Sequence, residues 1–283
     1  MFDFSQNRLN KFERGQTNIL IDIDSLYYIA ACKGLQEIEI KSGIFVEAFV
    51  LREAVAAMDE VIDGYRAANC NVLLYSEPLD REGFSNFRYF VNRNYKGNRK
   101  SSKAPRGLKI LKEFYLNSNP LVSLPAPFLE TDDMLAYDYS LATRFGYECS
   151  IVSVDKDYKP LSNVHHYYLD VDMQVHDEFF WYKQCLLGDT ADNIAGVKGV
   201  GEATAFKFFA DKGGYTKEQM EEAIVAFCEK KGHSLEQLYR DFACLQLLTE
   251  SMYVDASCIK YEAFGQQFTI DYIDGEFSYE AAK

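Results

Sequence analysis

A chain of 283 residues suits one large domain or a domain with a smaller appendage, and 48% hydrophobic residues suffice for a buried core. No apolar run is long enough to span a membrane, and residues 1–7 do not resemble a signal peptide, so we expect a cytoplasmic protein without membrane contact. The seven cysteines are odd in number and never spaced C-x-x-C, which argues against disulfides and zinc ligands. The net charge of −13, taken alone, argues against binding of nucleic acid.

Strand-like and helical patterns alternate through the first two thirds of the chain. Apolar and β-branched runs predict strands at 18–24, 71–76, 148–154 and 163–169, and helical spacing predicts helices at 45–68, 107–116 and 131–144. This alternation is typical of βαβ units, so we expect an α/β fold with a mostly parallel sheet.

Acidic residues stand where these predicted elements begin or end. They are Asp22 and Asp24, then Glu77, then Glu130, Asp132 and Asp133, then Asp155 and Asp157, and finally Asp189 and Asp192. Each group has an ordinary explanation as a helix cap or turn, and Asp24 with Ser25 fits such a cap best. The carboxyl ends of parallel strands meet at one edge of a sheet, so the groups are expected to converge there. Converging carboxylates repel each other, and Mg²⁺ or Mn²⁺ is the natural neutraliser.

A basic tract interrupts this acidic chain. Nine of its 30 Lys and Arg residues fall between Arg88 and Lys112, with no acidic residue among them. The tract is either a local binding surface for a polyanion or a solvated basic loop.

Beyond about residue 175 helical patterns dominate, at 176–187, 201–210, 217–231 and 234–249, and residues 261–283 remain unassigned. Gly196-Val-Lys198-Gly199-Val-Gly201 directly precedes one of these helices. Glycines at this spacing predict either a turn whose amides grip a phosphate or a plain joint between two helices.

The order of these motifs resembles the flap endonuclease and 5′–3′ exonuclease family, especially its bacteriophage members. The resemblance rests on Leu20-Ile-Asp22, Tyr95-Lys96-Gly-Asn98-Arg99, Glu130-Thr-Asp132-Asp133-Met134, Ser153-Val-Asp155-Lys-Asp157, and the run from Gly188 through Asp189, Asp192 and Gly196 to Gly201. It implies a PIN-like three-layer α/β nuclease domain at 1–185, with a basic arch at about 84–117. A smaller helical DNA-binding region at 186–283 would carry a helix–three-turn–helix module.

The resemblance also implies roles for individual residues. Two Mg²⁺ ions, replaceable by Mn²⁺, would be held by Asp22, Glu130, Asp132, Asp133 and Asp155 and by Asp157, Asp189 and Asp192. Glu77 stands where relatives often carry an Asp, and is either a further ligand or a solvated side chain. Lys96 and Arg99 would act at the scissile phosphate together with the metal-binding Asp132 and Asp155. DNA contacts would come from Tyr95 as a stacking ring, from Lys100 and Lys103, and from Gly196, Lys198, Gly199 and Gly201, where K⁺ can assist.

The implied function is Mg²⁺-dependent 5′ cleavage of DNA in replication, primer removal or degradation, by a monomer in the cytoplasm of a cell or of a phage host. One alternative is RNase H-like 5′ cleavage of RNA–DNA hybrids. Another is a haloacid-dehalogenase-like phosphatase built on Asp22 and Asp24, which leaves the basic tract and Glu130–Asp133 unexplained. A third is a binding protein without catalytic activity.

Overall fold

The computed structural model describes most of the chain. The described ranges are 8–79, 86–98, 104–126, 128–162, 164–166, 171–172, 176–254, 258–273 and 276–282.

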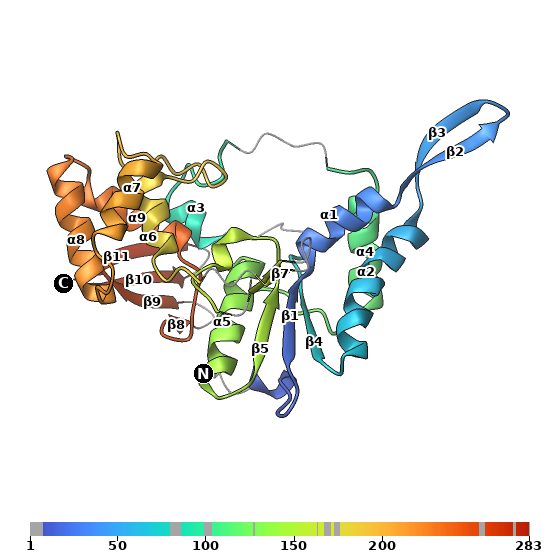
Figure 1. Ribbon diagram of the computed structural model, residues 1–283, viewed down its shortest axis with the longest axis horizontal. Coiled ribbons are helices and arrows are strands. Elements are labelled where there is room, and N and C mark those ends of the chain that lie inside the picture. Colours follow the sequence, from blue (N-terminus) through green and yellow to red (C-terminus); the bar gives the residue numbers. More distant parts are fainter. Residues whose placement is uncertain are drawn as a thin grey trace.

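A five-stranded sheet forms the centre of the molecule, with the strand order β4-β1-β5-β6-β7 (Figure 1). All neighbouring strands are parallel except β7, which runs antiparallel to β6. The predicted mostly parallel sheet is therefore confirmed. The strands are β1 (Asn18–Asp22), β4 (Asn71–Tyr75), β5 (Cys149–Val152), β6 (Val164–His166) and β7 (Val171–Asp172).

Helices cover both faces of this sheet, which gives three layers. Side chains alternate along β1, so Ile19 and Ile21 face one helical layer while Leu20 faces the other. The first layer contains α1 (Ile23–Lys33), α2 (Leu51–Ala67) and α4 (Leu108–Ser118). The second contains α5 (Thr131–Arg144), which packs on β1 and β5. The short helices η1 (Leu9–Lys11), α3 (Phe87–Val91) and η2 (Lys156–Tyr158) complete this part.

A two-stranded hairpin, β2 (Leu35–Lys41) and β3 (Ile44–Phe49), links α1 to α2 and projects from the body (Figure 1). The predicted helix at 45–68 is therefore wrong for its first residues, because α2 begins only at Leu51. Ile44, Phe45 and Val46 are β-branched or aromatic, and such residues favour a strand as soon as a partner strand is present.

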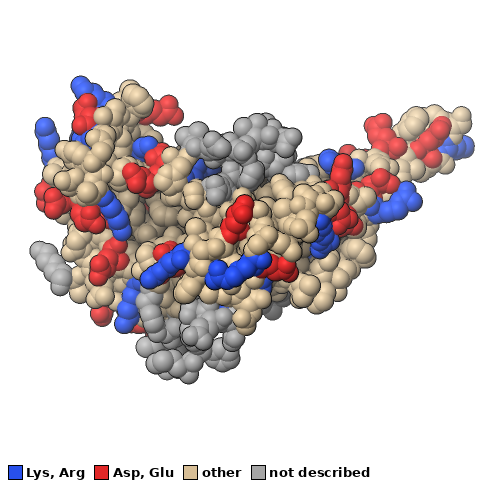
Figure 2. Space-filling model, turned by 60° about the horizontal axis from the view of Figure 1, so that its bottom comes forward, with Lys and Arg blue, Asp and Glu red and all other residues tan. Residues whose placement is uncertain are grey.

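The projecting hairpin is solvated along most of its length. Ile40 is 64% and Phe45 58% exposed. Glu37 lies directly opposite Glu47 in the register, so two like charges face each other across the strands. The hairpin stands out at one end of the space-filling view with its acidic side chains in view (Figure 2).

Because the hairpin buries little, we predict that it contributes little to stability. Replacing residues 37–47 by a short Gly-Ser linker should change the free energy of unfolding by less than about 1 kcal/mol. Chemical denaturation of the full-length and shortened chains measures the difference. A substantially larger loss would show that the hairpin has packing partners in solution.

Four helices follow the sheet, within the ranges that the helical patterns predict. They are α6 (Phe180–Leu187), α7 (Glu202–Ala210), α8 (Lys217–Lys230) and α9 (Leu235–Leu245). The C-terminal region, expected to be mainly helical with residues 261–283 unassigned, also contains strands beyond residue 250. A four-stranded antiparallel sheet of order β11-β10-β9-β8 lies there, made of β8 (Tyr253–Val254), β9 (Cys258–Ala263), β10 (Gln266–Ile273) and β11 (Glu276–Ala282).

One hydrophobic core runs from the central sheet into the C-terminal region. It contains Leu20 of β1 as well as Phe242 of α9 and Phe268 of β10. The division at residues 185 and 186 remains a prediction, and the core continues across it. All seven cysteines are free thiols, as predicted. Among the described residues no helix has both the length and the apolar character needed to cross a membrane.

Candidate active site

Asp22 closes β1 and also caps α1. Its carboxylate accepts hydrogen bonds from the Asp24 amide at 3.1 Å and from Ser153 Oγ at 3.2 Å. Burial, reinforced by the charges of Asp24 and Asp155, raises the pKa of Asp22 to about 8. The expectation that Asp24 caps this helix is wrong, because Asp22 has that place.

Asp24 instead connects three segments of the rim. It accepts from the Glu77 amide at 2.7 Å, from Ser76 Oγ at 3.3 Å and from Lys112 Nζ at 2.8 Å. Lys112 belongs to the basic tract, so one end of that tract folds back onto an acid of the rim. The sequence offered no signal for this pair, since its members are 88 positions apart.

Glu130 precedes α5 and is held by three donors. Lys96 Nζ reaches its Oε1 at 2.6 Å, and its Oε2 accepts from Tyr95 OH at 2.9 Å and from Arg88 Nη1 at 3.3 Å. Burial opposes ionisation of Glu130, but the charges of Arg88 and Lys96 outweigh it and lower the pKa to about 2. Glu130 is therefore a carboxylate at neutral pH.

Three further acids near the start of α5 differ sharply in their surroundings. Asp133 is fully buried and paired with Arg88, whereas Asp132 is half-buried. Burial, and then the charge of Glu130, raises the pKa of Asp132. Glu77 Oε1 accepts the Thr131 amide at 3.0 Å, so its carboxylate fixes the first residue of α5 rather than lying free in solvent.

Asp155 and Asp157 follow β5 on the turn that forms η2. Asp155 caps that turn by accepting the Asp157 amide at 2.9 Å. Asp157 accepts from Gln184 Nε2 of α6 at 3.3 Å. Burial, followed by the charges of Asp155 and Asp192, raises the pKa of Asp157 to about 7.

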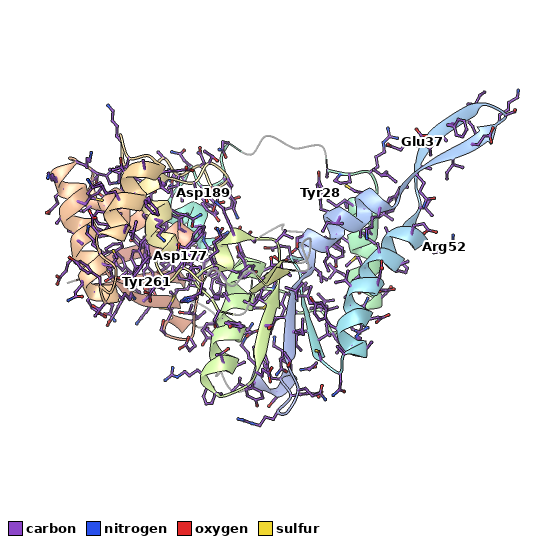
Figure 3. The ribbon with its side chains drawn as sticks, in the orientation of Figure 1. Tyr28, Glu37, Arg52, Asp177, Asp189 and Tyr261 are labelled. Atoms are coloured by element: carbon purple, nitrogen blue, oxygen red, sulfur yellow. The ribbon has the colours of Figure 1, made fainter. Side chains whose placement is uncertain are left out.

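Asp189 and Asp192 lie on the tight turn after α6, and both are buried. Asp189 Oδ2 accepts from Gln184 Nε2 at 2.6 Å and from Lys156 Nζ, and its Oδ1 accepts from the Ala191 amide at 2.8 Å. Figure 3 shows Asp189 on the same side of the molecule as the end of β1 that leads into α1.

The acidic groups lie close enough to influence one another. Asp155 raises the pKa of Asp22 and of Asp157, and Asp192 also raises that of Asp157. Within the described residues, however, no group of three or more His, Cys, Asp or Glu side chains is arranged to hold a metal ion. Several of these carboxylates are instead paired with cations, namely Lys96, Lys112, Lys156 and Arg88. The donor set still fits hard divalent cations, since buried carboxylates that crowd one another are the oxygen ligands such ions prefer.

The basic tract does not behave as one exposed stripe. Arg88 is 1% exposed and Tyr95 only 2%, so Arg88 is no part of a polyanion surface and Tyr95 leaves no open face for a base. The predicted stacking role of Tyr95 is contradicted by this burial, and both side chains bind Glu130 from inside the fold. Arg99, Lys100 and Lys103 lie outside the described residues.

Residues 94–98 dock onto the turn that carries Asp189 and Asp192. The Lys96 amide donates to the Asp192 carbonyl at 2.9 Å, Asn98 Nδ2 to the Thr190 carbonyl at 2.6 Å, and Asn193 Nδ2 to the Asn94 carbonyl at 2.8 Å. Lys96 adopts a positive φ of 54°. This docking explains how Lys96 comes to lie between Glu130 and the turn that carries Asp192.

The glycine run forms the predicted turn between two helices. The Val200 amide donates to the Val197 carbonyl at 3.0 Å, and Gly199 has the positive φ of 77° that such a turn requires. Lys198 is exposed at its tip, and Gly201 caps α7. The turn therefore offers a lysine and a helix N-terminus side by side.

We predict that two glycines of this run differ strongly in their tolerance of alanine. A Cβ on Gly199 would meet nothing within 4 Å, so Gly199→Ala should cost only the backbone strain of about 1–2 kcal/mol. A Cβ on Gly196 would lie 2.3 Å from the Gly188 amide nitrogen, and the backbone cannot relax without opening the turn. Urea denaturation should show Gly196→Ala to be clearly the less stable variant, and equal stabilities would contradict this packing.

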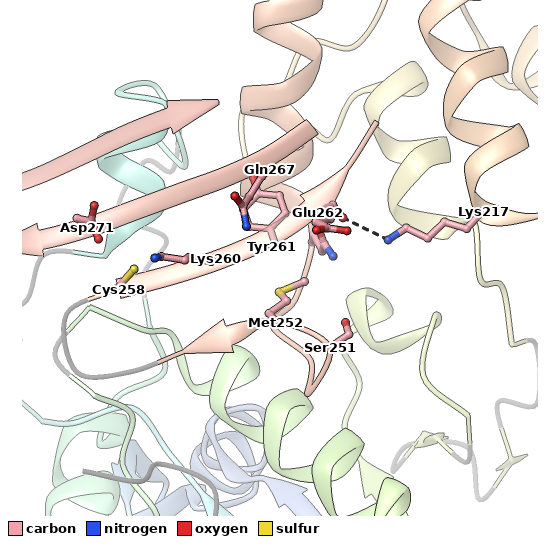
Figure 4. Close-up of a pocket in the computed structure, with 10 residues that line it drawn as sticks. Lys217, Ser251, Met252, Cys258, Lys260, Tyr261, Glu262, Gln267 and Asp271 are labelled. Carbon is pink, nitrogen blue, oxygen red and sulfur yellow. Dashed lines mark hydrogen bonds between the residues drawn. The ribbon is translucent and has the colours of Figure 1, made fainter. Parts of the chain in front are cut away.

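A separate pocket of about 740 Å³ lies in the C-terminal sheet region (Figure 4). Lys217, whose Nζ donates to the Glu262 carbonyl at 3.3 Å, lines it together with Tyr261 and Asp271. Its lining mixes both signs of charge and includes none of the acids of the rim. We therefore place the candidate site at the rim.

No family model matches the chain. The chain is 33% identical over 141 residues to a thermostable DNA polymerase I of Thermus aquaticus, which is 45% of this chain and 17% of that protein. It is 31% identical over 127 residues to an exodeoxyribonuclease of Enterobacteria phage T3, which is 43% of this chain and 42% of that protein. It is 29% identical over 118 residues to an exonuclease of Escherichia phage T7, covering 40% and 39%. The chain thus spans less than half the length of these curated relatives.

The fold is similar to that of the bacteriophage T5 flap endonuclease, solved as a pseudo-enzyme–product complex with DNA and metal ions. The TM-score is 0.52 at 16% identity, and the match covers 81% of this chain and 89% of that one. The predicted PIN-like α/β fold is thereby confirmed. Together with the phage exonucleases, this likeness also confirms the resemblance to the flap endonuclease and 5′–3′ exonuclease family.

Proposed function

We propose that the protein is a divalent-metal-dependent 5′ nuclease that hydrolyses DNA phosphodiesters as a 5′–3′ exonuclease or flap endonuclease. The observation that carries the proposal is the gathering of carboxylates from separate segments at one rim, with Lys96 and the glycine turn beside them. A phosphatase built on Asp22 and Asp24 fits less well, because Asp22 caps α1 and Asp24 is bound by Lys112.

We assign the acids to two groups. Asp22, Glu130, Asp132 and Asp155 would hold one Mg²⁺ or Mn²⁺, and Asp157, Asp189 and Asp192 a second. Bound there, the ions would supply an activated water and stabilise the leaving 3′ oxygen. We assign Glu77 a structural role rather than that of a metal ligand, because its carboxylate binds the Thr131 amide and holds the first residue of α5.

Lys96 has the clearest role among the basic residues. Its ammonium group lies on Glu130 and can turn from this carboxylate to a phosphate placed over the rim, where it would stabilise the negative charge that develops during cleavage. Arg99 would act beside it, with Lys100 and Lys103 extending the contact. The exposed Lys198, the amide groups of residues 196–201 and the N-terminus of α7 would hold the duplex backbone without reading bases.

The proposal also includes a monovalent cation, a second substrate and the oligomeric state. K⁺ would assist the turn at 196–201, so duplex affinity should be higher in K⁺ than in Li⁺ at equal ionic strength. An RNA strand annealed to DNA is a second candidate substrate. The enzyme would act as a monomer, and its free thiols suit a reducing cytoplasm.

The test is to incubate the protein and Mg²⁺ with 5′-labelled duplex, nicked, flap and RNA–DNA substrates and to size the products. Mononucleotides would indicate trimming from the end, and released oligomers would indicate incision at a junction. EDTA should stop both reactions. No cleavage of any substrate with Mg²⁺ or Mn²⁺ would refute the proposed function.

A further inference from the structure

Arg88 is the most completely bonded side chain near the rim, and neither its sequence position nor the proposed chemistry accounts for it. It is 1% exposed. A guanidinium group has five N–H donors in a planar fork. Nε donates to the Cys244 carbonyl at 2.8 Å, Nη2 to Asp133 Oδ1 at 2.6 Å and to the Gln246 carbonyl at 2.9 Å, and Nη1 to Asp133 Oδ2 and Glu130 Oε2. All five donors are used.

The two carbonyl groups come from the end of α9. The last carbonyls of a helix lack partners within the helix and carry partial negative charge, so a cation there is stabilising. Cys244 returns a contact through its thiol, which donates to the Arg88 carbonyl at 3.7 Å. Arg88 therefore ties α9 to the start of α5.

Asp133 is equally saturated on its side. Besides the two nitrogens of Arg88, its oxygens accept the Glu130 amide at 3.2 Å and the Leu248 amide at 3.4 Å. A carboxylate has about four lone-pair sites, so these four donors fill it. It has no exposed surface, in contrast to the half-buried Asp132 next to it.

We infer that Asp133 is not a metal ligand but the anchor for Arg88, and that Arg88 is a positioning residue that orients Glu130. This inference rests on the proposed function. Arg88 Nη1 and Tyr95 OH both bind Glu130 Oε2, which leaves Oε1 as the oxygen directed toward Lys96 and the rim. The end of α9 thereby fixes which oxygen of Glu130 is presented to a cation.

The primary experiment is Arg88→Lys, measured by calorimetric titration with Mn²⁺ after thermal unfolding has shown that the variant is folded. Lysine keeps the charge but has no planar fork, so it cannot hold Asp133, Glu130 and two carbonyls together. We expect Mn²⁺ affinity to fall by about tenfold or more, as for other residues that orient metal ligands, with affinity for a flap duplex nearly unchanged. Arg240→Lys is the matched control, because Arg240 bonds the Val91 carbonyl and Glu236 without contacting the acids of the rim.

A second comparison separates an anchor from a ligand. Arg88→Met removes the cation that pairs with the buried Asp133, and Asp133→Asn leaves Glu130 as the carboxylate that still pairs with Arg88, so both single variants should bind Mn²⁺ poorly. If Asp133 is the anchor, the double variant Arg88→Met/Asp133→Asn should bind Mn²⁺ better than Arg88→Met alone, with the wild-type number of ions. If Asp133 is a ligand, the double variant should bind Mn²⁺ no better than Arg88→Met and should bind fewer ions than the wild type.

The inference is overturned if Arg88→Lys binds Mn²⁺ within about twofold of the wild type, or if the double variant loses an ion. Either result would leave the proposed nuclease function intact, provided that the wild type cleaves DNA and binds Mn²⁺. If the wild type binds no Mn²⁺, both this inference and the proposed function are refuted.

Discussion

Replacing Asp132 and Asp155 together by asparagine should abolish DNA cleavage while leaving binding to a 5′-flap duplex in place. Both side chains belong to the group assigned to the first metal ion, and asparagine preserves their shape while removing their charge. Metal ions supply several kcal/mol of transition-state stabilisation, so the loss should reach about 10³-fold or more in the cleavage rate. Single-turnover cleavage of a labelled flap substrate measures this effect.

Binding should survive because the groups assigned to the duplex backbone lie elsewhere, on the turn at 196–201. Loss of two negative charges near a polyanion can only favour association. Asp63→Asn is the matched control, since Asp63 on α2 is 65% exposed and pairs only with Arg66 among the described residues. Turnover of the double variant near the wild-type rate would show that the two-group assignment is wrong.

Asp138→Asn should be strongly destabilising, although Asp138 lies outside the rim. Asp138 in α5 is fully buried and accepts hydrogen bonds from Arg8, from Lys11 Nζ at 2.6 Å and from Tyr75 OH at 2.9 Å. Removing one partner of a buried ion pair leaves uncompensated charge and costs about 3–5 kcal/mol. We expect about 3 kcal/mol in urea unfolding, at the lower end because Arg8 and Lys11 are partly exposed. Glu236→Gln, at an exposed helix pair, should cost less than about 0.5 kcal/mol.

The difference in the free energy of unfolding between wild type and Asp138→Asn should depend on pH. Burial opposes ionisation of Asp138, but Lys11 and Arg8 outweigh it and lower its pKa in the folded state. A lowered carboxyl pKa contributes stability that is complete above the unfolded value of about 4 and disappears as the pH falls through the folded value. The stability gap between wild type and Asp138→Asn should therefore be smaller at pH 3 than at pH 6, with the narrowing confined to pH values near and below about 4. A constant gap over that range would mean that the ion pairs are not its source.

Local signals were sufficient for the elements that build the rim. The structure places α5 at Thr131–Arg144 as predicted, because acids at its start and Gly146 after its end are both readable from neighbouring residues. The gathering of Asp22, Asp155 and Asp157 followed from the parallel strand order, which brings strand ends to one edge. Period-two alternation at Tyr261 and Ala263, and at Phe268 and Ile270, was also present and marks the side of the C-terminal sheet that joins the core.

The sequence could not reveal which acidic side chain each basic side chain binds. Arg88 is 45 positions from Asp133, and Lys112 is 88 positions from Asp24. Nothing in the composition of a basic tract distinguishes an arginine buried among carboxylates from one exposed to a polyanion. Partner choice of this kind depends on how α3 packs against α9 and how α4 packs against α1 and α2, and only the folded chain decides it.

The large sequence separation between Arg88 and its carbonyl partners has a consequence for synthesis on the ribosome. Its carbonyl partners lie 156 and 158 residues downstream, whereas every acid assigned to the rim has already been made by residue 192. A nascent chain that ends before α9 therefore carries the full set of acids without the contact that orients Glu130. Long-range closure of this kind is slow to form during folding, so it delays assembly of the rim until the C-terminal part has been translated.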